Sequence, residues 1–260
     1  MRILYVSIAY PLPANNGSKM RLWAVLRAMA SVGHQVTLAA FAEPEEVDGT
    51  EQELQMVCKD SDIVPLHYAR LSGGGSYLSR LRAIFSSLPF TIDRFRSDDM
   101  RLRLERRVRD RSFDVVICDN AYSAINLPAS ASPIVMNSQN VEYLILQRYA
   151  EQEKNPLKAL YARLEATKLR RFEAVMYRRA ACGMACSTVD AALVRQLCPG
   201  LKVFVAPMWW TCVSTRLRLK KTRWPSSTRA AWTGSPTAMH WSTLFGKFFR
   251  WCRRKFPACG

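Results

Sequence analysis

Three segments carry polar side chains that could bind a ligand, and each lies at the end of an apolar run. They are "YPLPANNGSKMR" (10–21), "CDNAYSAI" (118–125) and "NSQNVEYL" (137–144). Polar side chains directly after apolar strands lie where a ligand site is expected. A glycine at a helix start lets backbone N–H groups approach an anion. The candidate site residues are Asn16, Gly17, Ser18, Asp119, Asn120, Asn137, Gln139, Asn140 and Glu142.

Each candidate also has an explanation that involves no ligand. A turn glycine without a ligand explains Gly17 equally well. For the polar side chains in the other two segments, solvation of loop residues is the explanation that the pattern alone favours. The residue types alone therefore do not decide between a ligand-binding site and loop residues that face water. The elements that position these loops give further information.

Seven short apolar runs alternate with amphipathic segments along residues 1–207. This order is typical of parallel strands joined by crossover helices. The predicted strands are 2–9, 35–41, 62–67, 113–119, 132–138, 182–187 and 202–207. We therefore predict an α/β fold with a Rossmann-like, doubly wound, mainly parallel sheet. Ligands bind such sheets beyond the carboxyl ends of the strands, where the three polar segments would lie.

Helix boundaries are indicated at two places. Ser18 is predicted to cap a helix that ends at Gly33, since Ser is a favoured N-cap and Gly a favoured C-terminal residue. Ser187 is followed three residues later by Asp190, an arrangement that resembles a capping box and predicts a helix over 187–197.

Several protein classes are not favoured by the sequence. The apolar start is short and is interrupted by Pro11, so it does not resemble a secretory signal, and no stretch is long enough to span a membrane. The eight cysteines are scattered singly, which favours free thiols in a cytoplasmic protein. Cys182 and Cys186 lack a second ligand pair at zinc spacing, so no metal or cofactor is expected.

The charge is distributed unevenly. Residues 1–207 contain 27 of the 38 basic residues and all 21 acidic ones, a net charge of +6, whereas 208–260 contains eleven basic residues and no acidic one. Six of the seven tryptophans also lie in 208–260. A basic, Trp-bearing extension could bind nucleic acid through phosphate contacts and base stacking. This change in charge and tryptophan content predicts a boundary near residue 207.

Most of residues 1–207 resembles the N-terminal domain of GT-B glycosyltransferases of the family-four type. The similarity lies in the run from "MRILYVSIAYPLPANNGSKMR" to "GHQVTLAAF", in "NVEYLILQRYAEQEKNPLKALYARLEATKLRRFEAVMYRRA", in "ACSTVDAALV" and in "VFVAP". The resemblance implies one half of a GT-B fold that holds the acceptor, beside a second Rossmann domain that holds a nucleotide sugar. It implies sugar transfer, without an obligatory metal, to a carbohydrate or lipid-linked acceptor in polysaccharide or glycolipid synthesis.

The resemblance also implies roles for single residues. Gly17, with Asn16 and Ser18, matches the loop that approaches the donor diphosphate and the acceptor. The family often has His where this chain has Gln139, and Gln cannot carry a proton near neutral pH. A mechanism that needs a basic ring there is not supported. His34 lies in a "GHQV" turn that the family commonly has as "GHEV", and we interpret it as structural.

Two basic segments have simple structural explanations. Residues 94–111 interleave acids and arginines, as a solvated helix face does. Residues 157–180 form a helical pattern whose apolar stripe is expected to pack on the core, although an Arg-rich face could also contact anionic lipid. The resemblance to the family implies that this Arg-rich face makes a peripheral contact with the inner face of the membrane.

The codons that "MWWT" (208–211) requires suggest where that segment comes from. In the family "VAP" is followed by "NGVD" or a close variant. Met and Trp have one codon each, so "MWWT" is written ATG TGG TGG ACN, and one base restored before it permits Asn and forces Val-Val-Asp. The same shift permits the family's "DWxPN" at 232–237 and "DALEYFVREVLP" at 239–250. We expect 208–260 to be an irregular tail, an out-of-frame remnant of the donor-binding domain.

The sequence therefore predicts a glycosyltransferase-like protein, of the hexosyltransferase type by resemblance. The chain as written is expected to lack turnover, because the residues that hold the donor in this family lie in the second domain. A stand-alone nucleotide- or lipid-binding Rossmann module is the alternative, and a nucleic-acid-binding protein is a further one.

Overall fold

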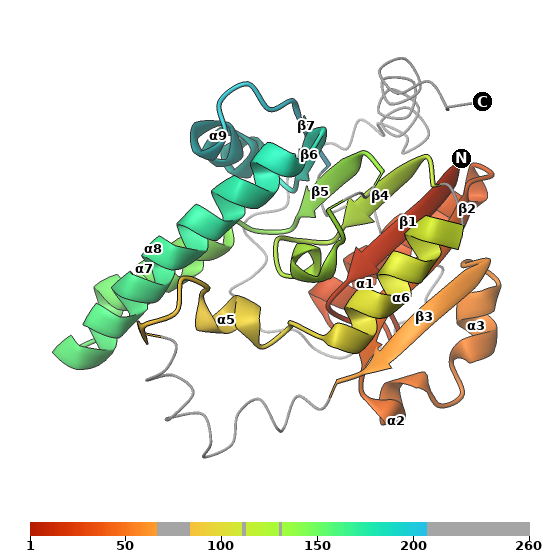
Figure 1. The fold of residues 1–260 in the computed structure, drawn as a ribbon, viewed down its shortest axis with the longest axis horizontal. Coiled ribbons are helices and arrows are strands. Elements are labelled where there is room, and N and C mark those ends of the chain that lie inside the picture. Colours follow the sequence, from red (N-terminus) through yellow and green to blue (C-terminus); the bar gives the residue numbers. More distant parts are fainter. Residues whose placement is uncertain (67–83, 111–112, 130–131, 207–260) are drawn as a thin grey trace, which may run out of the picture.

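A computed structural model describes residues 1–66, 84–110, 113–129 and 132–206. Its seven strands form one sheet in the order β3-β2-β1-β4-β5-β6-β7 (Figure 1). Each predicted strand is present, within a few residues of its expected ends. The bounds are Arg2–Ser7 (β1), Gln35–Ala42 (β2), Asp60–Pro65 (β3), Val115–Cys118 (β4), Ile134–Ser138 (β5), Cys182–Ala185 (β6) and Val203–Val205 (β7).

All six strand pairs are parallel, so the predicted α/β, Rossmann-like sheet is confirmed. β1 is an inner strand, where Ile3 pairs with Val36 of β2 and with Val115 of β4. The strand order reverses between β1 and β4, and this is the point where doubly wound sheets bind ligands at the carboxyl ends of their strands. We call that side of the sheet the carboxyl edge.

Helices cover both faces of the sheet (Figure 1). The bounds are Gly17–Ser31 (α1), Pro44–Val47 (α2), Glu51–Gln55 (α3), Phe90–Asp93 (α5), Asp98–Asp110 (α6), Glu142–Gln152 (α7), Pro156–Arg179 (α8) and Thr188–Leu197 (α9), with a 3-10 turn at Ser123–Asn126 (η2). α7 and α8 lie side by side as a hairpin that extends beyond the sheet (Figure 1).

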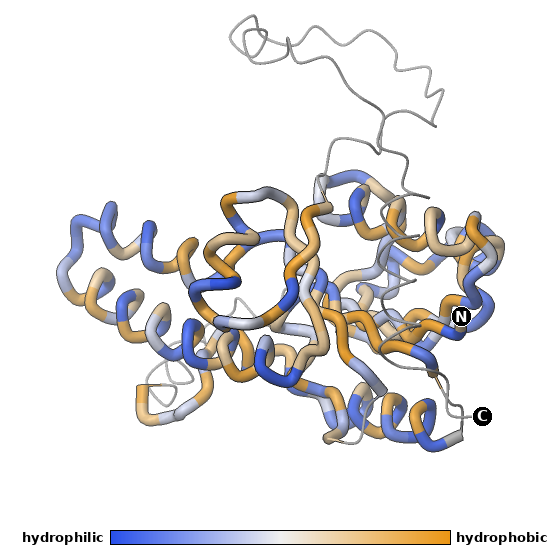
Figure 2. Tube along the Cα trace, turned by 90° about the horizontal axis from the view of Figure 1, so that it is seen from above, coloured by the Kyte–Doolittle hydropathy of each residue, from blue (hydrophilic) through white to orange (hydrophobic). Residues whose placement is uncertain are grey.

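Alternate residues of the central strands feed two separate apolar cores, because successive side chains of a strand point to opposite faces. Ile3 and Tyr5 of β1 pack in the core that α1 covers, and Leu4 and Val6 pack in the core that α6 and α8 cover. Figure 2 shows these strands as an apolar centre with mixed polar and apolar helices around it. The apolar stripe of α8 contributes Leu169, Phe172 and Met176 to the second core, as predicted.

Helix ends agree with the sequence in two of three cases. Gly33 follows α1 with φ +81°, and the Ser187 side chain caps α9 by accepting from the Asp190 backbone. The prediction for Ser18 is wrong. The N-cap of α1 is Asn16, whose side chain accepts from the backbone of Lys19, and Ser18 is already inside the first turn. Asn is as good a cap as Ser, so sequence alone did not separate the two.

The Arg-rich helix α6 is only partly a solvated face. Arg103 forms the expected surface pair with Asp99, four residues earlier. Arg107 instead reaches Asp60 and Asp62 of β3 and ties the edge strand to the helix. Met100 and Leu104 are buried beneath it.

Residues 207–260 lie outside the described residues, so the proposed boundary near 207 and the irregular tail stay predictions. Within the described ranges, no helix is both long and apolar enough to cross a membrane.

Candidate functional site at the carboxyl edge

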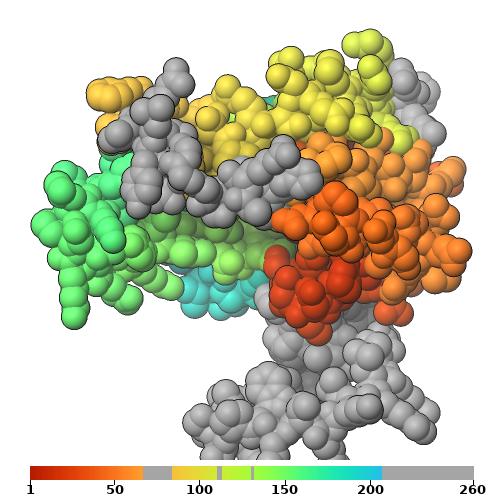
Figure 3. Space-filling view, turned by 90° about the horizontal axis from the view of Figure 1, so that it is seen from below, coloured from red at the N-terminus to blue at the C-terminus, as the bar shows by residue number. Residues whose placement is uncertain are grey.

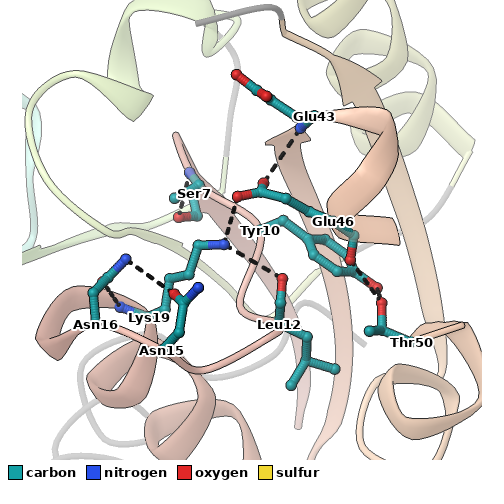
Figure 4. A network of polar contacts seen from close by, with 10 residues as sticks. Ser7, Tyr10, Leu12, Asn15, Asn16, Lys19, Glu43, Glu46 and Thr50 are labelled. Atoms are coloured by element: carbon teal, nitrogen blue, oxygen red, sulfur yellow. Dashed lines mark hydrogen bonds and ion pairs between the residues drawn. The ribbon is translucent and has the colours of Figure 1, made fainter. Parts of the chain in front are cut away.

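The first loop, between β1 and α1, is held in place by Lys19. The Lys19 Nζ lies 2.6 Å from Glu46 Oε1 of α2 and 3.4 Å from the Leu12 carbonyl (Figure 4). Lys19 is buried and the Glu46 side chain is 25% exposed, so this ion pair is partly shielded from solvent. Glu46 also accepts from the Glu43 backbone at 3.3 Å. The loop that carries Asn16 and Gly17 is therefore fixed against the neighbouring α2.

Asp119, the residue directly after β4, is the centre of the site. Its Oδ1 accepts from the Tyr5 hydroxyl at 2.8 Å and from Asn137 Nδ2 at 2.9 Å. Its Oδ2 accepts from Gln139 Nε2 at 3.1 Å and lies 3.5 Å from Ser7 Oγ. The carboxylate thus binds side chains from β1, β5 and the residue after β5. Burial raises its pKa to about 6, against the opposing effect of these hydrogen bonds.

Arg21 of α1 lies on the other side of Asn137 and is 3 % exposed. Its Nη2 donates to Asn137 Oδ1 at 3.1 Å, and its Nη1 donates to the carbonyl of Ala206 at 3.0 Å. The Arg21 charge lowers the pKa of Asp119, although burial outweighs it. Arg21 therefore joins α1 to the point where the chain leaves β7.

The three predicted polar loops come together through one short chain of hydrogen bonds. Ser18 Oγ donates to Gln139 Oε1 at 2.8 Å, and Gln139 passes a hydrogen bond on to Asp119. Ser18 is exposed and Gln139 is half-buried, so this is the solvent-facing end of the network. Figure 3 shows parts of residues 1–66 and of the α7–α8 hairpin on one face of the molecule.

Glu142, the first residue of α7, forms the acidic side of the site. Its Oε2 accepts from the Tyr122 hydroxyl at 3.3 Å. Burial, with a smaller effect of the Asp119 charge, raises the pKa of Glu142 to about 7. Glu173 of α8 lies next to it, and its carboxylate accepts from the backbone N–H groups of Glu142 and Tyr143. Burial raises the pKa of Glu173 to about 7 as well.

The remaining candidates have less direct positions. Asn120 is buried, and its Oδ1 accepts from the Ser123 backbone at 3.1 Å, so its side chain holds the turn after β4. Asn140 is exposed beside Gln139. Gly17 is the exposed first residue of α1. Its φ is not positive, unlike the φ of Gly33, Gly49 and Gly200. His34 lies away from these residues, with its Nδ1 3.4 Å from the N-terminal amine, which agrees with a structural role.

Sequence reasoning missed four residues of the network. Tyr5, Arg21 and Glu173 are buried in elements that read as core, and Lys19 reads as an ordinary helix lysine. A charged residue on the apolar face of a predicted helix was the only available signal for Arg21 and Glu173, because ionised groups are seldom buried without partners.

The part of the chain that the structure describes contains no group of three His, Cys, Asp or Glu side chains placed to hold a metal ion. Its five cysteines are free.

Comparisons with known proteins give remote likenesses. No protein-family profile matches the chain. An uncharacterized 44.6 kDa protein in the cps region of Klebsiella pneumoniae is 26% identical over 163 residues, which are 62% of this chain and 39% of that protein. The match thus spans well under half of that relative's length.

Two solved structures were found as remote structural matches. Glycyrrhiza uralensis UGT73P12, complexed with glycyrrhetinic acid 3-O-monoglucuronide, has a TM-score of 0.45 at 12% identity, covering 80% of this chain and 48% of that one. E. coli heptosyltransferase WaaC with ADP-2-deoxy-2-fluoro heptose has a TM-score of 0.27 at 14% identity, covering 80% and 76%. At these TM-scores the likeness is too remote to assign a family or an activity.

Proposed function

We propose that residues 1–207 are the acceptor-side domain of a GT-B-type glycosyltransferase, which transfers a sugar from a nucleotide sugar to a carbohydrate or lipid-linked acceptor. The observation that carries the proposal is the hydrogen-bonded series Ser18–Gln139–Asp119. It joins three loops, distant in sequence, at the edge of the sheet where ligands bind. Two of these loops, at 10–21 and 137–144, overlap with segments by which the sequence resembles the family.

The two sides of this edge differ in charge, and the difference suits two parts of a substrate. At the start of α1, Gly17 and Ser18 offer backbone N–H groups, and the first turn contains no acidic residue. This side would take the donor diphosphate. At the start of α7, Glu142 offers a carboxylate, a group that accepts hydrogen bonds from hydroxyls. This side would take the acceptor.

In the proposed reaction, an acceptor hydroxyl oxygen forms a bond to the anomeric carbon of the sugar. The bond from that carbon to the diphosphate oxygen breaks, and the hydroxyl proton leaves with the diphosphate or passes to solvent. The negative charge that develops on the leaving group is stabilised by the N–H groups of α1. Gln139 would orient the sugar or acceptor through hydrogen bonds and would not transfer a proton.

We further propose that 208–260 is an out-of-frame remnant of the donor-binding domain, and that the chain as written does not turn over. The support is the decoding of three separate stretches to one family's motifs, in order, by a single shift. The encoding DNA gives the first test. An open second frame continuing past codon 260 is expected, whereas a stand-alone Rossmann module or a nucleic-acid-binding extension requires none.

Restoring one base before codon 208 gives the activity test. The restored protein is expected to release nucleoside diphosphate from a panel of nucleotide sugars, measured against the original chain and a heat-treated control. In the restored background, Ser18→Ala with Gln139→Ala is expected to lower kcat/KM, whereas Arg27→Met on the exposed face of α1 leaves it unchanged. Release by none of the nucleotide sugars would argue against the proposal.

A peripheral membrane contact is a lesser proposal. Leu157 and Leu160 of α8 are 76% and 65% exposed, and Lys158 lies between them. Apolar side chains interleaved with cations suit an anionic lipid surface. Sedimentation with phosphatidylglycerol vesicles, compared with phosphatidylcholine vesicles, tests it, and Leu157→Ser with Leu160→Ser should abolish any difference.

A further inference from the structure

One face of α8 holds both ends of the loop that connects β5 to α7 (residues 138–142). The Tyr177 hydroxyl forms a short, buried hydrogen bond with Ser138 Oγ at the start of the loop. Glu173, one helical turn before Tyr177, accepts from the backbone N–H of Glu142 at 3.2 Å and of Tyr143 at 3.1 Å at the end of the loop. Residues four apart lie on the same face of a helix, so one stretch of α8 makes both contacts.

α7 has no cap of its own. Its N-cap residue is Val141, whose side chain makes no capping hydrogen bond. The first N–H groups of a helix need acceptors, and here a carboxylate from another helix supplies them. A negative charge is also favourable at this end of the helix dipole. Glu173 therefore does for α7 what Asn155 does for α8, where the Asn155 Oδ1 accepts from Leu157 and Lys158 at 3.0 and 3.2 Å.

Glu173 is 1 % exposed, and among the described residues no Lys, Arg or His forms an ion pair with it. The titratable groups that face it are Glu142 of α7, Tyr122 after β4 and Tyr177 of α8. A buried carboxylate without a cation is costly, and two N–H donors offset only part of that cost. Core packing alone would be served better by an apolar residue, so the position of Glu173 is explained by the N–H groups it binds.

We propose that Glu173 is the positioning residue of the 138–142 loop, with Tyr177 as its second anchor. Through this pair, α8 sets where Gln139 and Glu142 lie at the carboxyl edge. The importance of that placement rests on the function proposed above. The anchoring itself does not, and it is tested without substrate.

The experiment is hydrogen–deuterium exchange of the full chain, resolved to the amides of Glu142 and Tyr143. The amides of Leu157 and Lys158 serve as the internal reference, because their Asn155 cap does not titrate. Glu173→Gln keeps the shape but replaces one accepting oxygen with an N–H₂ donor. It is expected to speed exchange at Glu142 and Tyr143 about five-fold relative to the reference, as loss of one capping interaction does.

Glu165→Gln is the matched control variant. Glu165 is also buried in α8, and its Oε2 accepts from the Phe90 backbone at 2.7 Å, away from the loop. This change should leave the exchange ratio at Glu142 and Tyr143 within about two-fold of the wild type.

Exchange measured over a series of pH values separates the effect of the Glu173 carboxylate on the 138–142 loop from a general loss of protein stability. In the wild type, the exchange ratio should rise as the pH falls through about 7, because protonation removes one accepting oxygen of Glu173. In Glu173→Gln the rise should be clearly smaller, because only Glu142 still titrates next to these amides in that pH range. Equal exchange in the variant and the wild type would overturn the proposal. If the variant does not fold, the wild type is sufficient for the test. An exchange ratio that does not change with pH in the wild type would then overturn the proposal.

Discussion

Ser18 and Gln139 are 121 residues apart in sequence, yet their side chains share a hydrogen bond of 2.8 Å between Oγ and Oε1. The bond bridges the first turn of α1 and the loop after β5 across the central strands of the sheet. It is neutral and exposed, so its net contribution to stability is expected to be small.

A double-mutant cycle with Ser18→Ala and Gln139→Ala measures that contribution. Since both groups can bind water instead, we expect a coupling of about 0.5 kcal/mol in urea-induced unfolding. A coupling of several kcal/mol would mean that the bond is part of the structural core and not of an accessible edge.

Arg21 should be far more important for stability. Replacing it with Met removes two donors and leaves Asn137 Oδ1 and the Ala206 carbonyl without the partners they now have. We expect a loss of about 2–4 kcal/mol in the free energy of unfolding. Arg27→Met is the control on the exposed face of α1 and should change stability by less than about 0.5 kcal/mol. Similar losses for both variants would contradict the network.

The raised pKa values of Asp119, Glu142 and Glu173 predict how stability depends on pH. Between about pH 4.5 and 7 the folded protein retains protons that the unfolded chain has released. The stabilisation is complete below the unfolded pKa values and is lost as the pH rises through the folded ones. Chemical denaturation should therefore give a lower free energy of unfolding at pH 8 than at pH 5.

Glu142→Gln isolates one of these groups. The Gln oxygen can still accept from the Tyr122 hydroxyl, but no charge is buried at high pH. The variant should be more stable than the wild type at pH 8 and nearly equal to it at pH 5. Equal pH slopes in the two proteins would show that the Glu142 pKa is not raised.

Removal of 208–260 tests the frameshift interpretation on the protein itself. The six tryptophans of this segment follow no helical or strand period, and no acidic residue accompanies its eleven basic ones. A chain that ends at Pro207 should melt within about 2 °C of the full chain and be at least as soluble. A fall of many degrees would indicate a genuine subdomain.

The sequence by itself indicated the sheet, because seven short apolar runs alternate with amphipathic segments, an order typical of parallel strands joined by crossover helices. It also placed Asn16, Asp119 and Gln139 at the carboxyl edge, since parallel strands end on the same side. Capping could not be settled locally. Asn16 and Ser18 are both good caps, and the contact of Ser18 with Gln139 is visible only once β1 and β5 lie in one sheet.

Tertiary structure alone decided the partners of the buried charges. Nothing in the sequence near Arg21 or Glu173 points to Ala206 or to the start of α7, because both interactions use backbone atoms, which every residue has. A side chain that binds distant backbone leaves no complementary residue type in the sequence. Which residues support the site therefore depends on how α1 and α8 pack on the sheet, and only the folded chain fixes that.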